Sequence, residues 1–201
     1  MKEKLAKALC DANIIKFGLF SLASGRKSPV YLDVRVLPSS PASFSAVVEQ
    51  LAKKVKELNI DIVAGAETAG IPIAAAIAIK AKLPMIYVRK RPKSYGTQSF
   101  IEGVLEKGKK VVLIDDMITD GRSKIRFIEG IRKEGAVCDD VLVIIDREQG
   151  GTEGLAAENA KLHSLITLKE LLEYMKNNKA VDDDNYNITM NYLNNPEQWN
   201  N

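Results

Sequence analysis

The sequence predicts an α/β protein with a parallel, twisted sheet flanked by helices. Two stretches, residues 61–90 and 109–146, each begin with an aliphatic run, continue with a pattern typical of a helix, and end with a second aliphatic run. This order of strand, helix and strand is typical of a βαβ unit, which builds parallel sheets. Ligands of such sheets bind beyond the carboxyl ends of the strands, so we expect the functional residues there.

The segment before the first unit is predicted to contain two helices and one strand. An opening helix is indicated by apolar residues at helical spacing: Leu5, Leu9, Ala12 and Ile15. Residues 21–29, SLASGRKSP, are predicted to form a loop and residues 30–36, VYLDVRV, a short strand. An amphipathic helix is expected over residues 43–58.

The two βαβ units are separated by a polar, basic stretch from Arg89 to Phe100. After about Lys176 the chain becomes rich in asparagine and has apolar residues enough for one helix. We expect a single domain over residues 1–201, without internal repeats. Strands and helices of the two units are predicted, in order, over residues 61–66, 71–82, 84–90, 109–116, 123–135 and 140–146.

Composition restricts the classes of function. A chain of 201 residues can bury a substantial core without disulfides. The 29 basic and 26 acidic residues give a formal net charge of +3, too small an excess for a general nucleic-acid binder. Cys10 and Cys138 form no CxxC motif. The first 18 residues are charged throughout and lack the apolar core of a signal sequence, and the longest uncharged apolar stretch, residues 68–79, is too short to span a membrane. We therefore expect a cytoplasmic protein that binds neither nucleic acid nor membrane.

A loop between a strand and a helix, residues 119–123, has the composition of a phosphate site. Its sequence, TDGRS, can direct several backbone N–H groups and two hydroxyls at one phosphate at the start of the helix. The chain lacks the GxxxxGK[ST] motif of nucleotide triphosphatases and the GxGxxG motif of dinucleotide-binding proteins. The loop therefore indicates a phosphate ligand of another class.

Asp115 and Asp116 end the aliphatic strand directly before this loop. One interpretation is that they cap or flank the helix that follows. Their position beside a phosphate site favours another, because a sugar whose 5-phosphate occupied the loop would place its ring hydroxyls against two ionised carboxylates, which are strong hydrogen-bond acceptors. Paired acids at a solvent-facing strand end therefore predict a ribose phosphate.

The stretch VVLIDDMITDG, residues 111–121, resembles the phosphoribosyl diphosphate (PRPP) signature of type I phosphoribosyltransferases. Four further blocks resemble those of orotate phosphoribosyltransferases, in the same order and at similar spacing: FSLASGRKSPVYLDVR, AETAGIPIA, YVRKRPKSYGTQSFIEG and DREQGG. The resemblance covers residues 15 to 175. It implies the type I phosphoribosyltransferase fold with a small N-terminal hood, residues 1–40, and leaves residues 177–201 as an Asn-rich tail.

The resemblance also implies residue roles. Catalytic roles fall on Lys93, Asp115 and Asp116, with Lys93 in a mobile basic lid. The residues implied to bind PRPP are Arg89, Lys90, Lys93, Tyr95, Asp115, Asp116, Met117, Ile118, Thr119, Asp120, Gly121, Arg122 and Ser123. Those implied to approach pyrophosphate through their backbone are Glu67, Thr68, Ala69 and Gly70, although a plain helix-capping turn also explains this stretch.

Orotate is implied to contact Thr119, Arg147, Lys27 and Tyr31. For Arg147, a guanidinium can hold a carboxylate in fixed geometry, and the alternative is a surface ion pair with Glu148. Several positions depart from the pattern of many family members. Tyr95 stands in place of histidine, Ala69 and Ala23 in place of lysine, and Arg122 in place of a small residue, where its side chain can add charge to the phosphate loop.

The activity implied by the resemblance is transfer of the phosphoribosyl group from PRPP to orotate in pyrimidine biosynthesis. Magnesium is implied as cofactor, held mainly by PRPP and water and not directly by protein side chains. The implied assembly is a homodimer whose lid acts in the neighbouring subunit, with possible association with an orotidine 5-phosphate decarboxylase. Two alternatives stay open: a purine-type phosphoribosyltransferase and a regulatory protein that binds PRPP without turning it over.

Overall fold

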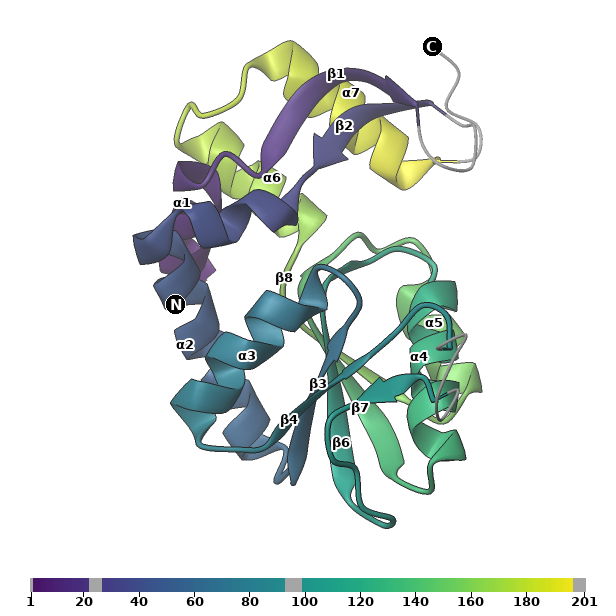
Figure 1. Ribbon diagram of the computed structural model, residues 1–201. Coiled ribbons are helices and arrows are strands. Elements are labelled where there is room, and N and C mark those ends of the chain that lie inside the picture. The colour runs from purple at the N-terminus through teal and green to yellow at the C-terminus, as the bar shows by residue number, and fades with distance from the viewer. Residues whose placement is uncertain (1, 22–26, 93–98, 197–201) are drawn as a thin grey trace.

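The computed structural model describes residues 2–21, 27–92 and 99–196. Its centre is a six-stranded sheet of order β5-β4-β3-β6-β7-β8 (Figure 1), parallel throughout except for the pair β4 and β5. The predicted parallel α/β sheet is therefore confirmed. Its strands are β3 (Ile62–Ala66), β4 (Met85–Val88), β5 (Ile101–Glu102), β6 (Lys110–Ile118), β7 (Val137–Asp146) and β8 (Lys161–Thr167).

Helices cover both faces of this sheet. In Figure 1, α2 (Pro41–Glu57) and α3 (Gly70–Ala81) lie on one face, whereas α4 (Arg122–Lys133) and α5 (Gly151–Ala157) lie on the other. Helices on both faces bury most of the central strands β3, β6 and β7, which explains why these strands read as aliphatic runs. A ligand of such a sheet is expected at the polar carboxyl ends of its strands.

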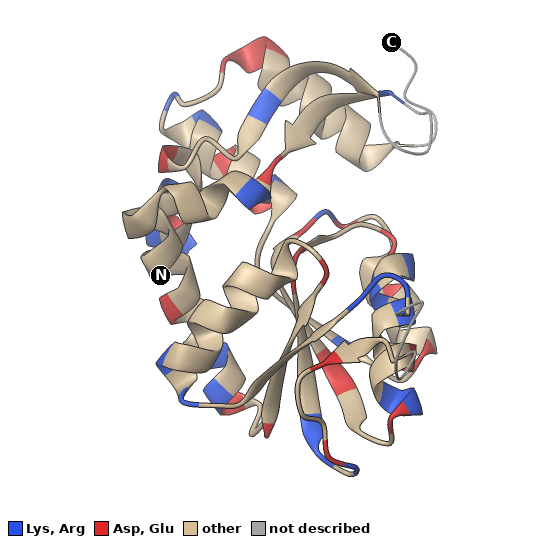
Figure 2. Cartoon of the chain, in the orientation of Figure 1, with Lys and Arg blue, Asp and Glu red and all other residues tan. Residues whose placement is uncertain are grey.

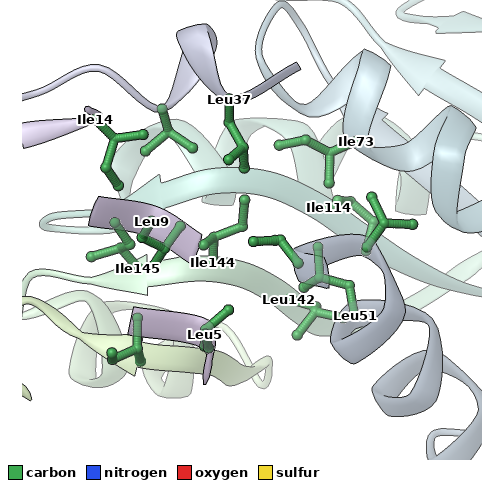
Figure 3. Close-up of a cluster of buried hydrophobic side chains, with 14 of the residues drawn as sticks. Leu5, Leu9, Ile14, Leu37, Leu51, Ile73, Ile114, Leu142, Ile144 and Ile145 are labelled. Carbon is green, nitrogen blue, oxygen red and sulfur yellow. The ribbon is translucent and has the colours of Figure 1, made fainter. Parts of the chain in front are cut away.

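The core is divided in two by the sheet, because successive strand residues point to opposite faces. Leu113 of β6 packs in the cluster that contains α4, and the next residue, Ile114, packs in the cluster that contains α2 and α3. Figure 3 shows the second cluster, in which Ile114 and Leu142 meet Leu51 and Ile73 of the helices. Burial of one such side chain contributes roughly 1.5–3 kcal/mol. The same alternation governs the acids further along β6.

Both ends of the chain contribute to a hood over the carboxyl ends of the strands (Figure 1). A separate two-stranded antiparallel sheet pairs β1 (Ile15–Ser21) with β2 (Lys27–Leu32). Alongside it lie α1 (Lys2–Asp11), α6 (Leu168–Asn177) and α7 (Asp183–Asn194). The Asn-rich tail thus forms a helix that packs on β2.

The N-terminal predictions were partly wrong. The opening helix ends at Asp11, because Asn13 adopts a left-handed conformation (φ 52°), and Ile15 already belongs to a strand that was not predicted. The second strand begins at Lys27, inside the expected loop. It ends at Leu32, and residues 34–36 of the expected strand form the first half of a 3-10 helix, η1 (Val34–Ser39).

Other differences lie towards the carboxyl end. Strand β6 continues to Ile118, two residues beyond its predicted end, so both acids lie within the strand. The short strand β5 and the elements α5, β8 and α6 were not predicted. In the part of the chain that the structure describes, every helix is too short or too polar to cross a bilayer.

Candidate active site

A cavity of about 440 Å³ opens at the carboxyl ends of β3, β4 and β6, below β2 of the hood. Figure 2 shows acidic and basic positions alternating along this edge of the sheet. The cavity collects the Asp pair, the β3–α3 turn and part of the basic segment after β4. Its lining is Tyr31, Leu32, Arg35, Glu67, Thr68, Ala69, Lys90, Asp115, Asp116, Met117, Ser123, Lys124 and Phe127.

Asp115 is not solvent-facing, contrary to the sequence prediction. It is only 7 % exposed, and its Oδ2 lies 2.6 Å from Nζ of Lys124, which is equally buried. The expectation was wrong because Asp115 points to the same face of β6 as Leu113, towards α4, and the first turn of α4 covers it. Lys124 itself was missed by sequence reasoning.

Asp116 points to the opposite side and is less buried than Asp115. Its Oδ1 accepts a hydrogen bond of 2.7 Å from the backbone N–H of Met117. Burial, followed by the negative charge of Asp115, raises the pKa of Asp116 to about 6, and Lys124 acts in the opposite direction. The two acids are therefore not equivalent: one is paired inside the protein and the other is an ionisable group facing the cavity.

The predicted phosphate loop turns at Gly121, which has a φ of +81° and precedes α4. The backbone N–H groups of Lys124 and Ile125 donate to the Gly121 carbonyl, at 2.9 and 3.0 Å. Arg122 does not leave a free charge for the loop, because its guanidinium is paired with Asp120 at 2.5 Å. Of residues 119–123, Ser123 lines the cavity.

The turn between β3 and α3 forms the opposite wall. Oε2 of Glu67 accepts a hydrogen bond of 2.6 Å from the backbone N–H of Lys90, which ties this turn to the segment after β4. At Gly70, a Cβ would lie 2.3 Å from the carbonyl oxygen of Ile114. Glycine is therefore required here for the packing of α3 against β6, a reason independent of any ligand.

The basic segment after β4 is divided between two cavities. Lys90 lines both, whereas Arg89 lines only a neighbouring cavity of about 270 Å³ and pairs with Glu102 at 3.2 Å. Lys93 and Tyr95, for which lid roles were predicted, lie outside the described residues.

On the hood side, Tyr31 lines the cavity as predicted for a substrate-facing residue, but Lys27 does not. The Tyr31 hydroxyl accepts a hydrogen bond of 2.8 Å from Arg35, and its ring lies 5.4 Å from that of Phe20. Lys27 instead donates to Ser21 at 2.8 Å. Arg35 is a cavity cation that sequence reasoning missed.

Arg147 lies outside the cavity lining, buried where β7 ends. It is 8 % exposed, and its side chain contacts the Tyr192 hydroxyl of α7 at 3.5 Å while Nε has no hydrogen-bond partner among the described residues. Burial lowers its pKa. The expected alternative, a surface ion pair with Glu148, is not formed, and within the described ranges no carboxylate lies within ion-pair distance of Arg147.

The backbone places Arg147 beside the phosphate loop. Its N–H donates to the carbonyl of Ile118 at 3.1 Å, so Arg147 and Thr119, both predicted to meet the same ligand, follow the ends of adjacent strands. Gly151, at the start of α5, packs against the same loop, and a Cβ there would lie 2.9 Å from the carbonyl oxygen of Thr119.

The sheet is mostly parallel, its central strand β6 carries paired acids near its carboxyl end, and a glycine-containing loop leads from β6 into α4. The class of protein to which these features belong is given by comparison with known families. Residues 37–156 match the family model of the phosphoribosyl transferase domain. Among curated proteins, the orotate phosphoribosyltransferase of Methanocaldococcus jannaschii is 42% identical over 170 residues, covering 85% of this chain and 96% of that protein. The protein of the same name from Sulfolobus acidocaldarius is 37% identical over 187 residues, covering 93% of this chain and 94% of that one.

Solved structures give the same result. Orotate phosphoribosyltransferase from Aeropyrum pernix superposes with a TM-score of 0.79 at 38% identity, over 86% of this chain and 98% of that chain. UMP synthase of Leishmania donovani gives a TM-score of 0.87 at 32% identity, and the match covers 98% of this chain but only 42% of that longer chain. The chain belongs to the orotate phosphoribosyltransferase family of type I phosphoribosyltransferases.

Proposed function

We propose that this protein transfers the 5-phosphoribosyl group of PRPP to orotate, giving orotidine 5-phosphate and pyrophosphate for pyrimidine biosynthesis. The observation that carries the proposal is one cavity that joins the acid pair of β6, the first turn of α4 and the β3–α3 turn. Relatives that share more than a third of the sequence over nearly the whole chain bear the name of this activity.

For PRPP, the geometry supports a division of the cavity into three parts. The carboxylate of Asp116, with Asp115 behind it, would accept hydrogen bonds from the ribose hydroxyls. Residues 119–123 would hold the 5-phosphate at the N-terminus of α4, where the helix dipole favours an anion. The diphosphate would lie between the turn at residues 67–70 and the basic side chains of Arg89 and Lys90, with Lys93 and Tyr95 of the lid completing the site.

For the acceptor, the support comes from Arg147. A buried guanidinium without a carboxylate partner in the described structure has lost its hydration without gaining a counter-charge. Orotate carries a carboxylate that would supply this charge through paired hydrogen bonds. Thr119 follows the adjacent strand end, and Tyr31 and Lys27 of the hood would cover the pyrimidine ring.

The reaction needs orientation and charge more than a protein nucleophile. A ring nitrogen of orotate would attack the anomeric carbon as the bond to pyrophosphate breaks, through a state with oxocarbenium character. Ionised Asp116 would stabilise the positive charge that develops on the ribose, and the cations after β4 would stabilise the negative charge that develops on the leaving group. The hood would hold the acceptor on the opposite side of the ring from the leaving group.

Magnesium belongs to this proposal as the cofactor. The described cavity lining contains few carboxylates, and one of them, Asp115, is engaged by Lys124. This small donor set fits an ion that takes most of its oxygens from the diphosphate and from water. When bound, the ion would neutralise charge on the departing pyrophosphate.

The test is an absorbance assay for orotate consumption with PRPP and Mg²⁺. Turnover with orotate, absent with hypoxanthine or adenine and strongly reduced in Asp116→Asn, is the expected result. Turnover of a purine instead would identify a purine-type enzyme. PRPP binding without turnover of any acceptor would identify a regulatory protein.

We also propose a cytoplasmic homodimer of single-domain chains in which Lys93 acts in the partner's site, possibly associated with orotidine 5-phosphate decarboxylase. Family resemblance carries this proposal. Mixing Lys93→Ala with Asp116→Asn under subunit exchange should restore about a quarter of the sites, because one site of each mixed dimer is native. No recovery, with exchange confirmed by mass measurement, would place Lys93 in its own chain's site.

A further inference from the structure

Lys124 is a buried cation in the wall of the cavity. It occupies the first turn of α4, beside Ser123 and below Phe127, both of which also line the cavity. Its ammonium group lies 2.6 Å from Oδ2 of Asp115, and both side chains are more than nine-tenths buried. Lysine is almost never this buried unless it is paired, because removing its charge from water is expensive.

The pairing is selective for one of the two acids. Alternation along β6 turns Asp115 towards α4 and Asp116 away from it, so a single lysine on α4 reaches Asp115 alone. The backbone enforces this arrangement, since Oδ1 of Asp115 accepts the N–H of Asp116 at 3.0 Å. Two adjacent carboxylates are thereby left with one internal counter-charge.

We propose that Lys124 is a positioning residue for phosphoribosyl transfer: it neutralises Asp115, so that Asp116 can ionise beside it and present the single negative charge of the pair to the ribose. This inference rests on the proposed function, because it assigns the cavity-facing charge to a sugar ligand. It adds a residue of α4, outside the PRPP-binding stretch implied by the resemblance.

The charges around Asp116 determine what removal of Lys124 would do. From β6, Asp115 opposes ionisation of Asp116, and from α4, Lys124 favours it. The β3–α3 turn adds Glu67, the segment after β4 adds Lys90, and η1 adds Arg35 to the same cavity. Without the lysine, the two adjacent carboxylates would lie close together and lose the nearby positive charge of α4, and the one nearer solvent would hold its proton to higher pH.

The structural alternative is that Lys124 only stabilises the fold. Both readings predict a loss of stability when the lysine is replaced, so stability cannot separate them. They differ in the pH dependence of the reaction. If ionised Asp116 is the active form, activity falls as pH drops through its pKa, and raising that pKa moves the acid limb of the profile upward.

The experiment compares Lys124→Met, which removes the charge at similar length, with Lys124→Arg, which keeps it. The acid limb of kcat/KM for PRPP should move up by about one pH unit or more in the methionine variant, as expected for loss of an opposite charge at this distance. In the arginine variant it should remain close to that of the wild type. An unmoved limb in Lys124→Met, with only thermal stability reduced, overturns the proposal.

A second variant covers the case in which Lys124→Met does not fold. Asp115→Asn combined with Lys124→Met removes both charges of the pair, and its acid limb should lie at or below that of the wild type, since the opposing carboxylate is gone. A limb shifted upward in this double variant would contradict the proposal.

A binding-independent readout separates this inference from the proposed function. Carbon-13 NMR can titrate the Asp116 carboxyl in the ligand-free protein, with Asp116→Asn assigning the signal. A higher titration midpoint in Lys124→Met than in the wild type supports the charge division even if orotate is not the acceptor. An inactive wild type would reject the proposed function, whereas an unchanged midpoint would reject the role of Lys124.

Discussion

Lys124 and Arg147 are both cations buried at the carboxyl edge of the same sheet, but they differ in their partners. Lys124, on α4, forms an ion pair of 2.6 Å with Asp115. Arg147, after β7, contacts the hydroxyl of Tyr192 at 3.5 Å and leaves Nε without a hydrogen bond in the described structure. Each is more than nine-tenths buried.

The difference separates a charge used inside the protein from a charge held for a ligand. Replacing one partner of a buried ion pair leaves the charge of the other partner buried and uncompensated. A buried, unpaired cation instead destabilises the free protein and is stabilised when an anion binds. The same physical cost therefore predicts opposite effects of mutation at the two positions.

The largest expected effect is on stability at Lys124. Lys124→Met should lower the free energy of unfolding by about 3–5 kcal/mol, because Asp115 would remain buried without its partner. Urea unfolding at pH 7.5 would measure this. Combining it with Asp115→Asn should recover most of the loss, and a double variant as unstable as the single one would show that packing, not charge, is responsible.

An effect on stability of comparable size but opposite sign is expected when Asp116 is replaced. Its folded-state pKa of about 6 lies above the unfolded value, so the folded protein binds more protons between roughly pH 4 and 6, and stability falls as pH rises through this window. Asp116→Asn should therefore raise stability by up to about 3 kcal/mol at pH 8 and hardly at pH 4. Thermal unfolding at both pH values tests this. An equal change at both would mean that ionisation of Asp116 is not the cause.

The next effect concerns the acceptor. Arg147→Gln should raise the Michaelis constant for orotate by roughly 10- to 100-fold, since a hydrogen bond to a charged group contributes about 1.5–3 kcal/mol. The constant for PRPP should change little, and stability should stay level or rise because Arg147 has no carboxylate partner among the residues that the structure describes. Steady-state kinetics with each substrate varied in turn gives both constants. Equal increases would indicate that Arg147 supports the fold around both sites.

Much of the sheet could be predicted from the sequence because its strands are buried on both faces and appear as aliphatic runs. The acids of β6 could be placed at a strand end for the same reason. The β1–β2 hairpin of the hood could not be placed from periodicity, since β1 is only partly buried and the pairing has a register irregularity between Phe17 and Phe20. Helix α6 was missed although its capping box, Thr167 with Glu170, is present in the sequence.

The two buried cations, Lys124 and Arg147, differ in how far their surroundings could be predicted from the sequence. Lys124 precedes Phe127, Ile128 and Ile131 at helical spacing, so its place on the buried face of α4 could have been found from periodicity. Arg147 was identified through family resemblance, but its contact with Tyr192 spans 45 residues of sequence. No local pattern indicates such a contact, because it depends on how the tail helix packs against the hood.

That contact gives the smallest expected effect. The ring of Tyr192 is 3 % exposed, so Tyr192→Phe should preserve its packing and remove only the hydroxyl that faces Arg147. If the hydroxyl orients the guanidinium, the Michaelis constant for orotate should rise about fivefold, corresponding to a hydrogen bond of about 1 kcal/mol, with the constant for PRPP unchanged.

Tyr186→Phe is the matched control for this last variant. Tyr186 lies on the same helix, but its ring faces Lys176, with the ammonium group 5.2 Å from the ring centroid, and not Arg147. Tyr186→Phe should leave the Michaelis constants for orotate and PRPP unchanged. In an Arg147→Gln background, Tyr192→Phe should have almost no further effect on orotate, because the group that it orients is gone. An undiminished effect there would mean that the hydroxyl acts on the hood as a whole, and that Arg147 owes its position to the end of β7 alone.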